Sequence, residues 1–231
     1  MKTIRKANDR GRTKWDWLDS RHTFSFGEYF DPQHLGFRSL RVINDDLVQP
    51  GQGFGTHPHR DMEILTYVLS GQLAHRDSMG NGRTIETGEL QAMSAGRGIT
   101  HSEFNASEQV PVHFLQIWIT PDERGLTPSY SEWKPNGPAD RPLKLLASPT
   151  GADGSVRIHQ DARLYLGELV AHESSRHALA PGRGAWLHLI EGRVVSGSTT
   201  LSPGDALGVE EESSVEIAAQ EPSRFLLFDL A

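Results

Sequence analysis

The chain has 231 residues, a formal net charge of −7 and no cysteine. The lack of cysteine excludes disulfides, thiolate zinc sites, iron–sulfur ligation and cysteine nucleophiles, so a bound metal would need His, Glu, Asp, Asn or water ligands. The negative charge argues against a nucleic-acid-binding surface over the whole molecule. Residues 1–17 lack the apolar segment of a secretory signal, and no run approaches the ~18 apolar residues of a membrane span. We therefore expect a cytoplasmic protein that contacts neither nucleic acid nor membrane.

Apolar segments are short and are separated by turn residues along most of the chain. Six of them are rich in Val, Ile, Leu and aromatic residues, which is typical of strands. These predicted strands are residues 37–43, 63–69, 112–119, 185–190, 214–219 and 224–230. Residues 79–82 and 196–199 have the composition of hairpin turns, and residues 161–170 fit either a helix or a strand. Many short strands with glycine-rich turns predict an all-β sandwich or barrel.

A proline-rich segment divides the chain. Five of its 13 prolines lie between Pro121 and Pro142. Such a composition favours a linker over a strand or a helix. We therefore predict an N-terminal domain at 1–120, a linker at 121–142 and a C-terminal domain at 143–231.

The two halves resemble each other, which indicates a duplicated module. Residues 64–73 match 186–195 with Gly71 over Gly192, an offset of 121 residues, and residues 85–93 match 201–209 with Gly88 over Gly204, an offset of 116. These offsets assign an apolar counterpart to each of four polar residues of the first half. The counterparts of His57, His59, His101 and Glu103 are Ala178, Ala180, Ile217 and Ala219. Polar groups present in one copy and lost in the other predict a function confined to the first copy.

Those four polar residues form two pairs with a spacing of two. Residues i and i+2 of a strand point to the same face, so His57 and His59 can point to one place. His101 and Glu103 have the same spacing and can do the same. Neighbouring strands with these pairs would present three imidazoles and one carboxylate to a single metal ion. Pro58 cannot donate to a strand ladder, so its strand is predicted to be an edge strand or to be bulged there.

Two further carboxylates compete for the fourth ligand position. Glu63 shares the parity of His57 and His59 and is the stronger rival, with Asp61 the weaker one; an alternative for Glu63 is to orient an imidazole from outside the ligand set. Four protein ligands would leave two open positions on an octahedral ion. Open positions are typical of a catalytic ion, whereas structural zinc sites are closed.

The order of several motifs resembles a known family. "G-x5-H-x-H-x3-E-x7-G" (Gly51 to Gly71) and "G-x5-S-A-G-x4-H-x3-N" (Gly88 to Asn105) resemble the two cupin motifs. The segments TFSFGEYFDP, GFRSLRVINDD, GFGTHPHRDMEILTYVLSG, DSMGN, GELQAMSAGRGITHSE and LQIWI make the chain similar to the pirins, which include bacterial quercetin 2,3-dioxygenase-like members. The similarity is close over residues 1–120 and looser beyond.

The resemblance implies two cupin (jelly-roll-type) β-barrels in tandem, with metal in the N-terminal barrel only. In pirins the ligand positions correspond to His57, His59, His101 and Glu103, whereas the common cupin consensus uses a glutamate at the position of Glu63. The family suggests Fe(II), with Ni, Cu, Co, Mn or Zn as alternatives that the ligand types do not separate.

The resemblance also implies an activity: opening of the central ring of a flavonol such as quercetin by O2, with release of carbon monoxide. Glu103 would then be the general base. Phe24, Phe26, Phe30 and Met93 are candidates for an apolar pocket, and His22 and His34 for its rim. Asp45 and Asp46 are interpreted as turn residues that follow a strand.

Two other functions stay open. One is a metal-dependent regulatory protein that acts through a protein partner, and the other is a different cupin chemistry on another metabolite. Fold alone does not separate them from the dioxygenase.

Overall fold

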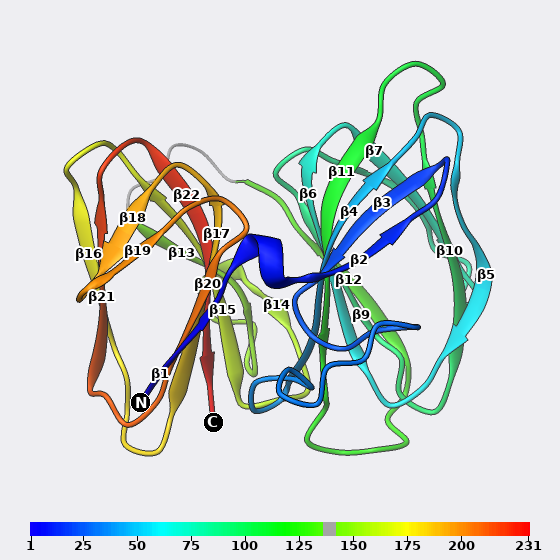
Figure 1. Cartoon of the computed structure of the whole chain (residues 1–231). Helices are drawn as coiled ribbons and strands as arrows, with labels where there is room; N and C mark the ends of the chain where they lie inside the picture. Colours follow the sequence, from blue (N-terminus) through cyan, green and yellow to red (C-terminus); the bar gives the residue numbers. More distant parts are fainter. Residues whose placement is uncertain (136–141) are drawn as a thin grey trace. The chain divides into compact units, whose positions relative to one another are not determined.

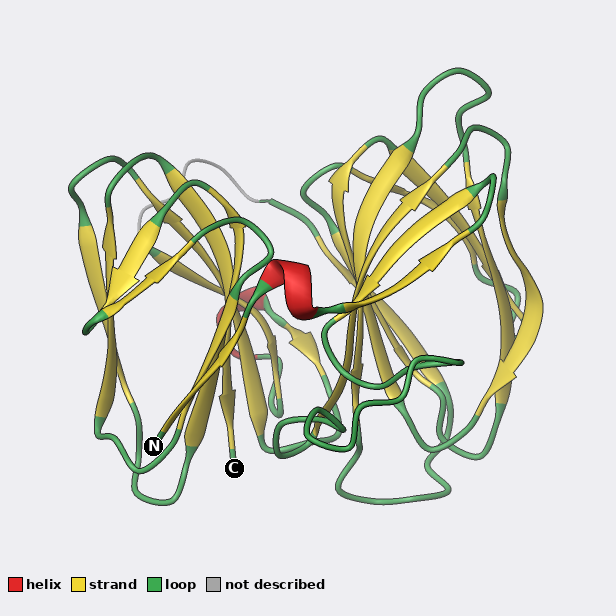
Figure 2. Cartoon of the chain, viewed as in Figure 1, coloured by secondary structure: helices red, strands yellow, loops and turns green. Residues whose placement is uncertain are grey.

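The computed structural model describes residues 1–135 and 142–231. Strands and the loops that connect them make up almost all of the described chain, as Figure 2 shows, and the all-β prediction is confirmed. Two short 3-10 helices, η1 (Ala7–Asp9) and η2 (Ala152–Gly154), are the helical elements of this part. No helix in the described ranges has the length and apolar character needed to cross a bilayer.

The first barrel consists of two antiparallel sheets. Its strands are β2 (Gly11–Lys14), β3 (Leu18–His22), β4 (Leu40–Val48), β5 (Gly53–His59), β6 (Glu63–Ser70), β7 (Gln72–Asp77), β8 (Gly82–Glu86), β9 (Leu90–Ser94), β10 (Ile99–Asn105), β11 (Val112–Ile119) and β12 (Ser129–Trp133). One sheet has the order β12-β9-β6-β11-β4-β3-β2, and the other has the order β5-β10-β7-β8. The short segment with β14 (Val156–Arg157) belongs to this unit as part of Val156–Gln160.

The second barrel repeats this arrangement. Its strands are β1 (Lys2–Arg5), β13 (Leu143–Ser148), β15 (Ala162–Leu169), β16 (Ser174–Ala178), β17 (Gly184–Glu191), β18 (Val194–Ser196), β19 (Thr199–Leu201), β20 (Ala206–Val209), β21 (Ser214–Ala219) and β22 (Ser223–Leu230). One sheet contains the order β1-β20-β17-β22-β15-β13, and the other has the order β16-β21-β18-β19. Each position in these orders has a counterpart in the first barrel, which confirms the predicted duplication.

The N-terminal strand belongs to the second barrel and not to the first. Lys2 pairs with Val209 and Arg5 with Ala206, so β1 covers the edge of β20, and Figure 1 shows β1 (blue) running beside β20 (orange). In the first barrel the corresponding edge, that of β9, is covered by β12. Residues Met1–Arg10 accordingly group with Asp161–Ala231.

The observed division therefore differs from the predicted one at two places. The first ten residues leave the predicted domain 1–120, and β12 lies inside the predicted linker 121–142, where it forms five ladder pairs with β9. Proline content did not reveal this strand because the prolines flank it, at Pro128 and Pro135. Residues 136–141 of the predicted linker lie outside the described residues.

The six predicted strands are all present; two, at 112–119 and 214–219, have the predicted ends, and the other four have shifted ends. The largest shift is at 37–43, because β4 begins at Leu40 and continues to Val48. Asp45 and Asp46 are therefore strand residues, and their interpretation as turn residues is wrong. The segment 161–170, which fitted a helix or a strand, is β15. Both predicted hairpin turns join consecutive strands, β7 to β8 and β18 to β19.

Deletion of residues 1–5 tests the assignment of β1. The deletion removes the partner of β20, so the backbone amides of Ala206–Val209 that face β1 should lose protection from hydrogen exchange by about tenfold or more. Peptide-resolved hydrogen–deuterium exchange measures this. Protection of β9 in the first barrel should be unchanged, and an unchanged β20 would contradict the assignment.

Candidate metal centre

Strands β5 and β10 carry the candidate ligands and pair with each other. His57 and His101 are direct partners in the antiparallel register, and His59 pairs with Ile99. β5 is the edge strand of its sheet, and the register shifts between His101 and Glu103, so the prediction drawn from Pro58 is confirmed. On an edge strand, one row of backbone groups has no neighbouring strand to pair with. Pro58, which has no N–H to donate, is therefore tolerated there.

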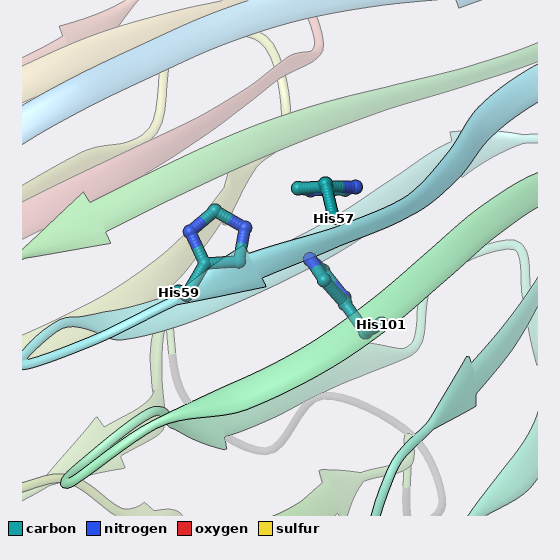
Figure 3. A group of neighbouring side chains, drawn as sticks. All are labelled: His57, His59 and His101. Atoms are coloured by element: carbon teal, nitrogen blue, oxygen red, sulfur yellow. The ribbon is translucent and has the colours of Figure 1, made fainter.

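The two strands bring three imidazoles together. The nitrogen atoms that His57, His59 and His101 can offer to a metal all lie within 4.8 Å of one another. Their ring centroids are 4.5 to 4.8 Å apart, and in Figure 3 the rings of His57 and His59 rise from β5 and face that of His101 on β10. Among the residues that the structure describes, no other group of three His or acidic side chains is so arranged.

The second nitrogen of two of these rings is held by the protein. His57 Nδ1 lies 2.8 Å from the carbonyl oxygen of Gly55 and must donate to it, which leaves Nε2 as a lone-pair donor. His101 Nδ1 lies 3.2 Å from His75 Nε2, while its own Nε2 is buried without a hydrogen-bond partner. A buried nitrogen without a partner is costly unless something binds it, so these rings fit a metal ion.

Burial keeps the imidazoles in the form that a metal needs. Burial, reinforced by the neighbouring histidines, lowers the pKa of His59 to about 3 and that of His101 to about 3. Both rings are therefore neutral at neutral and mildly acidic pH. Metal ligation requires this neutral form, because a protonated ring has no lone pair to offer.

Glu103 lies in the same cavity as the histidines but is hydrogen-bonded to the protein. Gln116 Nε2 donates to both of its oxygens, at 3.1 and 2.9 Å, and Thr66 Oγ1 donates to Oε1 at 3.2 Å. Burial raises the pKa of Glu103, although these hydrogen bonds and His75 oppose the shift. The structure groups the three histidines by themselves, so the role of Glu103 as the fourth ligand stays a prediction.

The rival carboxylates are engaged elsewhere. Glu63 accepts hydrogen bonds from Ser94 Oγ at 2.6 Å and from the backbone nitrogen of His159 at 3.2 Å. Asp61 accepts one from the backbone nitrogen of Gly125 at 2.7 Å. Neither residue lines the cavity that contains His57, His59 and Glu103. This geometry favours Glu103 over both rivals.

The close approach of β5 to β10 depends on Gly53. A Cβ atom at this position would lie 2.2 Å from the carbonyl oxygen of Glu103 and 2.5 Å from Cα of Phe104. Any side chain would therefore push the two strands apart. At Gly55, two residues along the same strand, a Cβ atom would meet nothing within 4 Å.

Two of the three histidines, His57 and His59, line a cavity of about 860 Å³ with aromatic walls. This volume is within the range of small-molecule sites. Of the four predicted apolar wall residues, only Phe26 lines it, because Phe24 and Met93 are buried in the core and Phe30 is 73% exposed. The aromatic residues that do line it are Trp15, Trp17, Phe26, Tyr29, Phe54 and Trp118. Of the predicted rim histidines, His22 lines the cavity, whereas His34 pairs with Asp31 at 2.7 Å.

Several residues that line the cavity were not predicted from the sequence. Trp118 and Gln116 share the parity of β11 that faces the cavity, and Asp46 shares that of β4. The alternation of side chains along β11 does not reveal which face lines the cavity, because polar and apolar residues both occur on its inner face. Asp46 was missed because its strand was predicted to end at residue 43.

The second barrel corrects the predicted counterparts. Leu73 pairs with Asn105 in the first barrel, and Val194, over Leu73 by the glycine match, pairs with Ala219 in the second. Asn105 thus corresponds to Ala219, which shifts the β10 offset to 114 and the β5 offset to 120 residues. The true counterparts of His57, His59, His101 and Glu103 are His177, Leu179, Val215 and Ile217.

Three of these four positions are still apolar. Leu179, Val215 and Ile217 belong to the hydrophobic core of the second barrel. His177 is instead bonded through Nε2 to Asp229 Oδ2 at 2.8 Å. The second barrel therefore fills with side chains the place where the first has its site.

Comparisons with known proteins agree with the fold and with the site. A family model described as pirin matches residues 3–119, and a model of the quercetinase C-terminal cupin domain matches residues 145–230. The chain belongs to the pirin family. The prediction of two cupin barrels in tandem is thereby confirmed.

This pirin is similar to named proteins and to solved structures. A quercetin 2,3-dioxygenase of Escherichia coli (strain K12) is 48% identical over 227 residues, 98% of this chain and 97% of the relative. The crystal structure of the bacterial pirin YhhW from Escherichia coli in complex with nickel(II) is 48% identical, has a TM-score of 0.96 and covers 100% of this chain and 99% of that chain. A quercetin 2,3-dioxygenase from Acinetobacter baumannii, 22% identical with a TM-score of 0.80 over 98% of this chain and 85% of that chain, shares the fold.

A pair of glycine variants tests the strand contact in this pirin. Gly53→Ala should weaken metal binding by about tenfold or more, because it separates the strands that align the three rings. Gly55→Ala is the matched control and should bind metal as the wild type does. Titration of the metal-free proteins with nickel(II) by calorimetry measures both. Equal affinities for the two variants would contradict the role of Gly53.

The buried carboxyl of Asp46 makes stability depend on pH. Burial raises the pKa of Asp46 from its ordinary 3.8 to about 7, with Asp45 and Glu103 adding to the shift and Ser20 and His113 opposing it. The folded state therefore keeps a proton that the unfolded chain releases between about pH 4 and pH 7, and the free energy of unfolding falls as pH rises through this window.

Asp46→Asn removes that dependence. Between pH 5 and pH 8 the free energy of unfolding of the variant should gain about 2 to 4 kcal/mol relative to the wild type. Urea denaturation of the metal-free proteins at each pH measures the difference. Asp16→Asn, at an exposed position, should run parallel to the wild type. A constant difference between Asp46→Asn and the wild type would show that Asp46 is ionised when folded.

Proposed function

We propose that this pirin is a metal-dependent dioxygenase that opens the central ring of a flavonol such as quercetin. Both atoms of O2 enter the product, and one ring carbon leaves as carbon monoxide. The observation that carries the proposal is the convergence of three imidazoles beside an aromatic-walled cavity that His57 and His59 line. The name of the 48% identical relative from Escherichia coli supports the same substrate class.

The proposed ligands are His57, His59, His101 and Glu103. A divalent ion held there would supply Lewis acidity to an oxygen of the substrate and a place for O2 beside it. Imidazole and carboxylate donors suit several ions, so the donor set does not choose among them. We propose Fe(II) as the native ion, and nickel(II) is the ion in the complex of the relative YhhW. The second barrel is proposed to be metal-free.

Glu103 is the proposed acceptor of the proton from the flavonol 3-hydroxyl. Its raised pKa makes it a stronger base than an exposed carboxylate. Gln116 and Thr66 fix the orientation of its oxygens, because both donate to the carboxylate. The deprotonated substrate is electron-rich and is therefore the partner that O2 can oxidise.

The aromatic walls fit a flat, conjugated ligand. Trp17 and Phe54 contact each other edge to face, with ring centroids 5.3 Å apart, and Trp118 stands edge to face against His59 at 4.9 Å. Flat rings pack against such surfaces with little loss of side-chain freedom, because the walls already contact one another.

Turnover of quercetin tests the proposal directly. Purified protein loaded separately with Fe, Ni, Cu, Co or Mn should bleach the visible band of quercetin and release one carbon monoxide for each substrate consumed. His101→Ala should reduce both metal content and turnover by about tenfold or more, because it removes a ligand. Metal analysis of the protein as purified identifies the native ion.

His113→Ala is the control. His113 pairs with Asp45 and does not line the cavity, so this variant should keep its metal and its turnover. Absence of turnover with all five ions would contradict the dioxygenase and favour a regulatory protein that acts through a protein partner. Full activity of His101→Ala would contradict the proposed ligand set.

A further inference from the structure

One buried carboxylate oxygen in the cavity of this pirin has no partner within the protein. Asp46 is 3% exposed, and its Oδ1 has no hydrogen-bond partner. The residue lines the same cavity as His57, His59 and Glu103. A buried acceptor that nothing satisfies is destabilising, and such atoms in binding sites are completed by the ligand.

The strand register explains why this oxygen is left over. On one side of Asp46, the paired residue of β3 is Ser20, which hydrogen-bonds the carboxyl group. On the other side, the paired residue of β11 is Phe114, which is fully buried and has no donor to offer. One oxygen of Asp46 is therefore satisfied across the sheet and the other is not.

The neighbouring polar groups on this wall satisfy one another. His22 Nδ1 lies 2.8 Å from Asn44 Oδ1, and His22 Nε2 lies 2.8 Å from Thr13 Oγ1. These three side chains line the cavity together with Asp46. Among the described residues that line the cavity, two side-chain atoms are buried without a partner, Asp46 Oδ1 and Trp118 Nε1, and Asp46 Oδ1 is the acceptor of the two.

Asp46 is also separate from the group that holds Glu103. Asn44 pairs with Gln116, which donates to Glu103, whereas Asp46 pairs with Phe114, two residues away. Two residues advance along a strand by about 7 Å. A ligand that contacts both Asp46 and the group around Glu103 therefore needs two polar groups set apart from each other.

We infer that Asp46 is a specificity-determining residue, whose Oδ1 accepts a hydrogen bond from a phenolic hydroxyl of the substrate other than the one that faces the histidines. The inference rests on the proposed flavonol dioxygenase activity and deepens it. Asp46 selects flavonols with hydroxyl groups beyond the 3-position, because only these satisfy its free oxygen. A phenolic hydroxyl supplies Oδ1 with the hydrogen-bond partner that water supplies in the unfolded chain.

Selectivity between two flavonols tests the inference. Quercetin has five hydroxyl groups and 3-hydroxyflavone has only the one at position 3, so the ratio of their kcat/KM values reports the additional contacts. At pH 8, above the pKa of Asp46, hydrogen bonds to this charged acceptor correspond to about a ten- to hundredfold effect. Asp46→Leu should lower the quercetin to 3-hydroxyflavone ratio by that factor, whereas Asp46→Asn, which keeps an acceptor oxygen, should lower it less.

Asp45→Asn is the matched control. Asp45 is the next residue of the same strand, points to the opposite face and pairs with His113 at 2.5 Å, so its replacement should leave the ratio unchanged. Anaerobic titration of each metal-loaded protein with both flavonols, followed by tryptophan fluorescence, gives the same ratio from dissociation constants. The Asp46→Asn variant keeps the test valid where Asp46→Leu does not fold.

The outcomes distinguish the role of Asp46 from the proposed dioxygenase activity. A wild type that turns over quercetin, with a ratio that both Asp46 variants leave unchanged, overturns the inference and leaves the dioxygenase standing. A wild type that turns over neither flavonol overturns the dioxygenase and the inference together. A ratio that falls in Asp45→Asn as much as in Asp46→Leu also overturns the inference, because the effect would then belong to the strand and not to the carboxylate in the cavity.

Discussion

The pairing of β5 with β10 is the contact on which the site depends. Each strand supplies part of the imidazole group, and His57 and His101 face each other only in the observed register. The register requires the backbones to approach closely, which Gly53 permits because it has no side chain. The edge position of β5 accommodates Pro58, the register shift between Phe54 and His57 precedes it, and the Gly55 carbonyl accepts a hydrogen bond from His57 Nδ1. Ring geometry and tautomer thus both follow from one strand pair.

Burial acts on the two kinds of ionisable group in opposite directions. It lowers the pKa values of His59 and His101, which frees their lone pairs, and it raises those of Glu103 and Asp46. Neutral imidazoles and basic carboxylates are a useful combination in one cavity. The former can hold an ion, and the latter can accept or hold protons at defined atoms.

Duplication followed by specialisation explains the difference between the barrels. Both have the same strand order, yet the second places Leu179, Val215 and Ile217 where the first has two histidines and Glu103. The fourth position kept its histidine, His177, but its Nε2 is bonded to Asp229. The second barrel also depends on β1 for its edge, so the N-terminus of the chain completes a fold whose other strands begin after residue 142.

Local sequence alone indicated six of the strands, the duplication and the histidine positions of this pirin. These features follow from alternation along single strands and from the spacing of glycine turns, which are set within a few residues. Tertiary structure decided which residues meet across strands. It placed β1 in the second barrel, held Glu63 at Ser94 and His159, and shifted the β10 offset from 116 to 114. It also turned Asp46 into the cavity. Such choices depend on loop lengths, bulges and partner strands distant in the chain, and no local pattern records them.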